Sequence, residues 1–243
     1  SSRRSTCPKP SDNLLWSVPR RGASLRTGTT HEAVTVPECK TSEMAAPMRP
    51  SMLLYLDLQL YRDILLLRFR ESPWNAFTLR QWEELDAVLA ALQGDNSEGR
   101  GEILPRSRSS LRGVVLVGSK TMFSVGDDSS QWTVSSDAHK RAWETAAETC
   151  CARLAALVKE LPVAAALSGY TCGRAWELAQ QCSYRVMGDN ARLYPSPEQG
   201  FINPSDALAA GMVERLAAPD LVLHEAQEWL FDDLHDSDHD DGR

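Results

Sequence analysis

Short apolar runs separated by glycines and charged residues make up the middle of this chain. The clearest run covers residues 162–167, PVAAAL, and Gly169 follows it closely. An uninterrupted apolar run of this length, closed by a turn signal, is typical of a strand buried on both faces. Gly173 then precedes a helix that begins near Arg174, and a second strand leads to Leu193. The stretch therefore predicts a strand, a glycine-marked turn, a helix and a strand, in that order.

Three further strands are expected before this stretch. Residues 53–61 and 63–69 read as two strands joined tightly at Arg62 and Asp63, and the second is apolar enough to be buried on both faces. Residues 113–119, GVVLVGS, indicate another buried strand of the parallel type. The alternation of short strands with helices favours an α/β fold.

Two amphipathic helices are expected between these strands. Thr78 and Gln81 have the spacing of a capping box in front of the first helix, and Gly94 ends it. The second helix spans Ala138 to Leu161. Apolar residues recur at helical spacing in both helices. They are Trp82, Leu85, Leu89 and Leu92 in the first helix, and Trp143, Ala147, Leu154, Leu157 and Val158 in the second.

The two ends of the chain differ from the middle in composition. Residues 1–50 contain several prolines and little periodic apolar pattern, so we expect an extended basic arm without a core of its own. Residues 1–30 are rich in Arg, Ser and Thr with Asp12 as their single acid, which indicates a mitochondrial presequence remnant or a plain basic tail. Residues 51–230 should form one domain, followed by an acidic tail over 231–243.

Charge and cysteine usage narrow the class of protein. The net charge is −7 over 243 residues, with the basic residues gathered at the start, so nucleic-acid binding through overall charge is not indicated. The arginine-rich loop at 95–112 is expected to be solvated rather than a binding surface. The six cysteines form no CxxC pair, which favours free thiols in a reducing compartment. His235 and His239 lie among tail aspartates, where we expect a solvated segment and no metal site.

From residue 161 to 193 the chain resembles the crotonase family, the enoyl-CoA hydratases and isomerases, whose usual pattern there is NGxxxGGGxELAxxCDxRxAxxxARF. Ser168 stands for the Asn, Gly169 for the first Gly, and Gly173 for the start of the Gly triplet. The remaining matches are Glu177-Leu178-Ala179, Cys182, Arg185 and Ala191-Arg192-Leu193. Other segments agree with the family in the same order: Asn75-Ala76-Phe77, then Phe123, Gly126 and Asp128, and finally residues 206–216.

The resemblance implies a repeated ββα spiral core and a site for acyl-CoA thioesters. The oxyanion donors would be the backbone N–H groups of Asp127 and Arg174. Glu177 would be one catalytic carboxylate, and the second falls on Glu198 if one residue is inserted or on Pro197 if none is. A hydratase needs both acids, whereas an isomerase needs one base. No cofactor is implied beyond a coenzyme A thioester, and that only if the protein is active.

The chain departs from the family pattern at the expected site. Arg174 occupies the second position of the Gly triplet, where a side chain would meet the acyl chain, and Ala175 occupies the third. The loop and helix that the family carries before the segment at 206–216 are missing. We expect the Arg174 guanidinium to pair with a nearby carboxylate, that of Asp127, Asp128 or Glu177, and to fill the acyl channel.

Two functional hypotheses follow. The first is a catalytically impaired crotonase-fold protein that serves as a structural subunit of a large mitochondrial assembly, such as a respiratory complex or the mitoribosome, on the matrix side. Its partners would be other protein subunits, bound through the arm and the acidic tail, or the other subunits of a crotonase-like homo- or hetero-oligomer. The second is an active enoyl-CoA hydratase or isomerase. A lyase, dehalogenase or thioesterase of the same superfamily is a further alternative.

Overall fold

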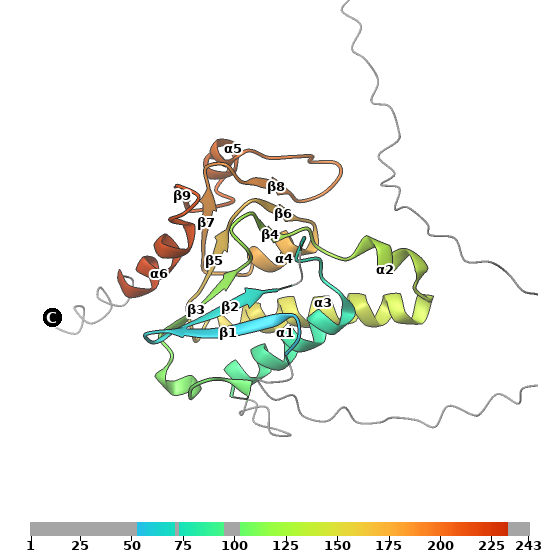
Figure 1. Ribbon diagram of the computed structural model, residues 1–243, viewed down its shortest axis with the longest axis horizontal. Helices are drawn as coiled ribbons and strands as arrows, with labels where there is room; N and C mark the ends of the chain where they lie inside the picture. The colour runs from blue at the N-terminus through green and yellow to red at the C-terminus, as the bar shows by residue number, and fades with distance from the viewer. Residues whose placement is uncertain (1–52, 71–72, 95–102, 233–243) are drawn as a thin grey trace, which may run out of the picture. The chain divides into compact units, whose positions relative to one another are not determined.

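The computed structural model describes residues 53–70, 73–94 and 103–232, and these form two sheets with helices packed around them (Figure 1). The strands are β1 (Leu56–Tyr61), β2 (Ile64–Phe69), β3 (Gly113–Val117), β4 (Met122–Ser124), β5 (Val163–Leu167), β6 (Tyr170–Cys172), β7 (Tyr184–Gly188), β8 (Arg192–Tyr194) and β9 (Arg215–Ala217). The helices are α1 (Leu79–Leu92), the short 3-10 helix η3 (Arg108–Ser110), α2 (Ser129–Val134), α3 (Asp137–Leu157), α4 (Arg174–Ala179), α5 (Pro204–Ala209) and α6 (Val222–Asp232).

The larger sheet has the strand order β1-β2-β3-β5-β7-β9. The predicted hairpin supplies its edge, with β1 antiparallel to β2, and every later pair is parallel. Parallel neighbours need crossover connections, which cover both faces of the sheet with helices. The two-sided burial expected for β2 and β5 is confirmed, because nearly every side chain of both strands is buried.

A second sheet has the order β4-β6-β8, and all its pairs are parallel. Each of the pairs β3–β4, β5–β6 and β7–β8 places its first strand in the large sheet and its second in the small one, and helix follows each pair. This is the repeated ββα spiral expected from the sequence. The strand β6 was not predicted, because a three-residue segment inside a glycine-marked turn carries too little pattern.

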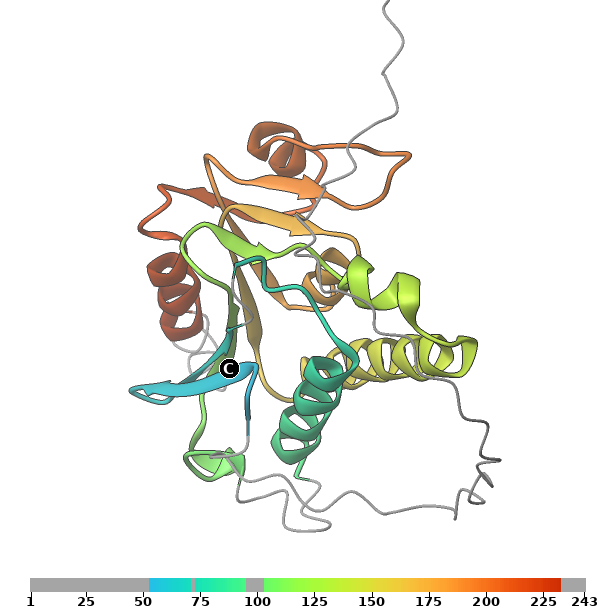
Figure 2. The ribbon, with the colours of Figure 1, turned by 45° about the vertical axis from the view of Figure 1, so that its right-hand side comes forward.

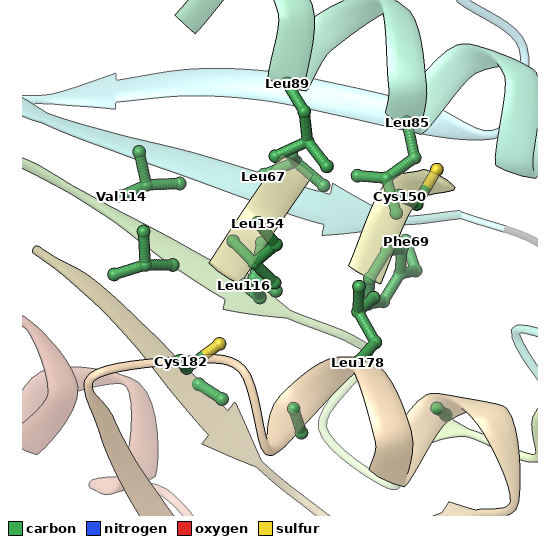
Figure 3. Close-up of a cluster of buried hydrophobic side chains, with 14 of the residues drawn as sticks. Leu67, Phe69, Leu85, Leu89, Val114, Leu116, Cys150, Leu154, Leu178 and Cys182 are labelled. Carbon is green, nitrogen blue, oxygen red and sulfur yellow. The ribbon is translucent and has the colours of Figure 1, made fainter. Parts of the chain in front are cut away.

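The core lies on both faces of the large sheet, since side chains alternate between the faces along each strand. Leu65 and Leu67 of β2 point into the larger cluster, which also receives α1, α3 and α4 (Figure 3). Ile64 and Leu66 of the same strand point to the other face, where they join the cluster under α6. The helices α1 and α3 lie side by side in both views of the ribbon (Figures 1 and 2).

The long helix is shorter at its end than its apolar pattern predicts. Helix α3 ends at Leu157 rather than Leu161, although Leu161 itself is buried. Pro162 accounts for an end before Leu161, because a proline has no N–H to donate and its ring would clash with the carbonyl four residues earlier, that of Val158, in a continuing helix. At the other side, the separate short helix α2 precedes α3 and was not predicted.

The capping box at the start of α1 is only half formed. The Thr78 side chain accepts from the Gln81 N–H at 3.1 Å, as the spacing predicts. The reciprocal bond is missing, because both polar atoms of the buried Gln81 side chain have no partner. The predicted cap is therefore correct for the threonine and wrong for the glutamine.

The part of the arginine-rich loop that the structure describes packs on the body of the protein. Arg106 forms an ion pair with Asp63 at 2.8 Å, and the Nε of Arg108 donates to the Leu92 carbonyl. Arg112 lies over the ring of Phe231. The composition predicted that this loop is solvated, whereas these three arginines all contact the body of the protein.

The arm over residues 1–50 and the tail beyond Asp232 lie outside the described residues. No helix in the described ranges is both long and apolar enough to span a membrane.

Glu84 on α1 accepts hydrogen bonds from the two residues that precede β1, and its removal should destabilise the fold. Its carboxylate is fully buried, accepts from the N–H groups of Leu54 and Tyr55 at 3.0–3.1 Å, and lies 3.5 Å from the Arg80 Nε. We expect Glu84→Ala to lower the free energy of unfolding by about 2–4 kcal/mol, because the two backbone N–H groups and Arg80 lose the carboxylate that they share. Chemical denaturation measures this, and Glu83→Ala on the exposed side of α1 is the control, expected to change stability by about 0.5 kcal/mol or less. Equal effects of the two substitutions would contradict the assignment.

Candidate functional site

Asp127, the first expected oxyanion donor, follows β4 and lies against the segment before α1. The Phe77 N–H donates to the Gly126 carbonyl at 2.7 Å, and the Asp128 N–H donates to the Phe77 carbonyl at 2.8 Å. Successive N–H groups of an extended segment point to opposite sides. The Asp127 N–H therefore points away from Phe77, and it donates to no acceptor within the described residues.

Arg174, the second expected donor, is the first residue of α4 and lies next to the same segment. Gly173 before it has φ +48°, a left-handed conformation that glycine adopts without strain. A Cβ added at Gly126 would lie only 2.7 Å from the Cys172 carbonyl oxygen and 3.4 Å from the Arg174 nitrogen. The two backbone segments therefore approach as closely as the absence of a side chain at Gly126 allows. The structure thus brings the two predicted donor segments together.

The Asp127 side chain is held by three donors. Its Oδ1 accepts from the indole N–H of Trp82 at 3.1 Å and from that of Trp143 at 3.0 Å. Its Oδ2 pairs with the Arg174 Nε at 2.9 Å. Both tryptophans are fully buried, while about a quarter of the Arg174 side chain is exposed. Two of these three donors therefore belong to α1 and α3, and the third belongs to α4.

Of the three carboxylates expected near Arg174, two are found there. Asp127 is the closer partner, and Glu177 Oε2 lies 3.7 Å from the Arg174 Nη1. Asp128 is not a partner, because its Oδ1 caps α2 by accepting from the N–H groups of Ser130 and Gln131. Burial acts to raise the pKa of Asp128, but the hydrogen bond from the Ser130 hydroxyl and those from the two N–H groups lower it overall. The Glu177 side chain is 55% exposed, so its weak pairing with Arg174 is open to solvent screening.

The second expected carboxylate is not brought to this site by any contact in the described part of the chain. Glu198 and Pro197 are both exposed in a turn between β8 and α5, and no hydrogen bond or ion pair joins Glu198 to Glu177 or Asp127. A hydrogen bond from the Ser196 side chain lowers the pKa of Glu198. No helix occurs between β8 and α5, consistent with the missing loop and helix.

The thiol of Cys151 is electrostatically coupled to the same site. Burial raises its pKa to about 11, the negative charge of Glu177 adds to the rise, and the positive charge of Arg174 opposes it. Cys151 is a free thiol, as expected. A thiol with this pKa is almost entirely protonated near neutral pH and is a poor nucleophile. Within the described ranges, no cluster of three or more His, Cys, Asp or Glu side chains forms a metal site.

A family model described as enoyl-CoA hydratase/isomerase matches residues 60–202, more than half of the chain. The chain belongs to the enoyl-CoA hydratase/isomerase family. The match contains both segments that meet at Asp127 and Arg174, and it ends where the turn with Glu198 rejoins β8 through the Leu193–Ile202 bridge. The family membership expected from the sequence is therefore confirmed.

Relatives with this crotonase fold include named hydratases and an isomerase. The probable enoyl-CoA hydratase EchA17 of Mycobacterium tuberculosis is 28% identical over 193 residues, and 68% of each chain is covered. The crystal structure of an enoyl-CoA hydratase from Bacillus anthracis superposes with a TM-score of 0.63 at 20% identity, covering 73% of this chain and 75% of that one. The human mitochondrial delta3-delta2-enoyl-CoA isomerase gives 0.60 at 18% identity, covering 72% and 75%. At these identities the structural likenesses show the fold alone.

The two tryptophans are the residues of this crotonase site that sequence reasoning missed. Both were expected only as core residues of helices, and both are buried. A buried indole N–H normally finds an acceptor, and that rule was the available signal. It could not name the acceptor, because Trp82 and Trp143 reach Asp127 only after α1 and α3 pack beside each other.

Proposed function

We propose that this crotonase-fold protein has lost most or all enoyl-CoA hydratase activity, and that the Arg174 side chain fills part of the acyl channel beside the oxyanion donors. The observation that carries the proposal is the 2.9 Å ion pair between the Arg174 Nε and the Asp127 Oδ2. It joins the side chains of the two residues whose backbone N–H groups would bind the thioester oxygen. A substrate acyl chain in that channel would have to displace the paired guanidinium.

The carboxylates support the same proposal. Glu177 lies near the donors, but its carboxylate faces the Arg174 guanidinium at 3.7 Å rather than an open channel. Glu198 lies in an exposed turn, and the hydrogen bond from Ser196 lowers its pKa, so even less of it carries a proton to donate at neutral pH than for an ordinary glutamate. Hydration needs two acids at one site, and no contact in the described residues brings Glu177 and Glu198 together.

For the biological role, we keep the assembly hypothesis as our proposal. The protein would act as a structural subunit of a mitochondrial assembly on the matrix side, with residues 1–50 contacting other subunits. The support is the basic composition of that arm, together with the presence of a single acid, Asp12, among residues 1–30.

The second candidate, an active hydratase or isomerase, is favoured by one specific observation. The Asp127 and Arg174 N–H groups remain on adjacent segments, and Glu177 is retained beside them. The named relatives carry hydratase and isomerase descriptions. A coenzyme A thioester would then be the substrate.

A spectrophotometric assay with a short-chain enoyl-CoA separates these candidates. We expect no hydration by the wild type above background and no acyl-CoA binding in the micromolar range. Arg174→Gly alone is expected to leave turnover absent, because Glu198 stays away from the site; a general acid or base typically contributes about 10²–10⁴-fold in rate.

The control variant is Glu177→Gln, which keeps the size of the side chain and removes its basicity. If the wild type hydrates the substrate and Glu177→Gln abolishes that activity, the impaired-enzyme proposal is wrong and the active enzyme is correct. Tight binding of acyl-CoA by the wild type without turnover would also contradict the proposal that Arg174 fills the acyl channel.

A further inference from the structure

The β1–β2 turn lies close to the end of α6 (Figure 1), and arginine side chains from this turn and from the segment before β3 lie over Phe231 of that helix. The guanidinium carbon of Arg62 lies 5.0 Å from the centre of the Phe231 ring, and that of Arg112 lies 5.7 Å from it. Arg106 lies nearby, paired with Asp63 of the same turn. We refer to Arg62, Arg106 and Arg112 as the arginine cluster. These residues precede strands β2 and β3, whereas Asp127 and Arg174 follow β4 and β6, so the cluster is separate from the candidate crotonase site.

The positive charge of the cluster is not balanced within the described part of the chain. Asp63 is used by Arg106, and no described carboxylate forms an ion pair with Arg62 or Arg112. Asp232 is exposed at the end of α6 and forms no ion pair there. Arg62 is exposed and Arg112 is half-buried. Guanidiniums that lie over an aromatic ring keep their N–H edges available for carboxylates.

Independently of the proposed function, we propose that the arginine cluster is the docking site of the chain's own acidic tail, residues 233–241. The tail carries five aspartates beyond α6: Asp233, Asp236, Asp238, Asp240 and Asp241. It starts two residues after Phe231, the ring on which two of the guanidiniums lie. An extended chain advances about 3.3–3.6 Å per residue, so the first aspartates are within reach of both arginines.

Charge and tethering select this occupant over others. The N-terminal arm is basic and would be repelled by the cluster. A segment attached this close has an effective local concentration in the millimolar range, which free acidic partners seldom reach. The tail therefore covers the cluster in the isolated protein, and an acidic partner would have to displace it.

Cleavage of the full chain by an endoproteinase that cuts before aspartate tests the proposal. The rate of cleavage within residues 233–241 is followed by mass spectrometry, with the free tail peptide in the same tube as an internal standard. Exposed ion pairs are individually weak and screened by salt. We expect Arg62→Glu with Arg112→Glu, or ~0.5 M NaCl on the wild type, to speed tail cleavage relative to the standard by about fivefold.

The matched control is Lys120→Glu with Arg141→Glu, which changes the net charge equally at exposed positions on the β3–β4 connection and on α3. It should leave tail cleavage as in the wild type. Equal rates in the wild type, the cluster variant and high salt would overturn the proposal. Protection that grows with protein concentration would also overturn it, because the cluster would then hold the tail of a second copy. The salt arm needs no substitution, so the test stands even if the cluster variant fails to fold.

Discussion

Gly169→Ala is expected to prevent the protein from folding to a stable state. Gly169 joins β5 to β6 with φ +62°, and a Cβ added there would lie 1.7 Å from the Thr121 carbonyl oxygen and 2.9 Å from the Met122 nitrogen. Both atoms belong to the backbone, so no side-chain rotation can relieve the overlap. We expect the loss of stability to exceed about 4 kcal/mol, because the turn can accept the methyl group only by separating β4 from β6.

Gly200→Ala is the matched control for that substitution. Gly200 also has a positive φ, +66°, but a Cβ there would meet nothing within 4 Å. Only backbone strain is added, at about 1–2 kcal/mol. Soluble yield and thermal unfolding of the two variants give the comparison. A folded Gly169→Ala variant that melts like Gly200→Ala would show that the start of β6 is not held this closely against β4.

Asp127→Ala is expected to lower the free energy of unfolding by about 2–4 kcal/mol, discounted for the partial exposure of the pair. The substitution leaves the indole N–H groups of Trp82 and Trp143 buried without an acceptor, and it leaves Arg174 without its closest partner. Each orphaned buried donor costs about 1–3 kcal/mol. Chemical denaturation, followed by the fluorescence of the buried tryptophans, measures the change.

Two further variants separate the parts of this effect. Asp127→Asn keeps an acceptor for the indoles but cannot neutralise Arg174, so its loss of stability should be smaller than that of the alanine variant. Asp128→Ala removes the cap of the short helix α2, for which about 1 kcal/mol is typical. If Asp127→Ala costs no more than Asp128→Ala, the network around Asp127 does not anchor the site.

The local patterns in the sequence determined most of the fold. Apolar runs of strand length identified β2, β3 and β5, and the glycines at 169 and 173 marked the turn and the start of α4. These features could be predicted because strand burial and left-handed turns depend on a few neighbouring residues. The errors occurred where the decisive interaction is not local. Three-residue strands such as β6 exist only because they pair with β4 and β8.

For the site, the sequence determined which residues belong to the crotonase pattern and that Arg174 intrudes on it. Only the tertiary structure decided which of the three candidate carboxylates pairs with Arg174. Asp128 caps α2 instead, whereas Asp127 is held beside the arginine by two indole N–H groups. These indoles come from α1 and α3, and their meeting point depends on how the two helices pack. The spacing of residues in the sequence does not reveal how side chains meet across such a contact. It does reveal which residues the site contains and their order along the chain.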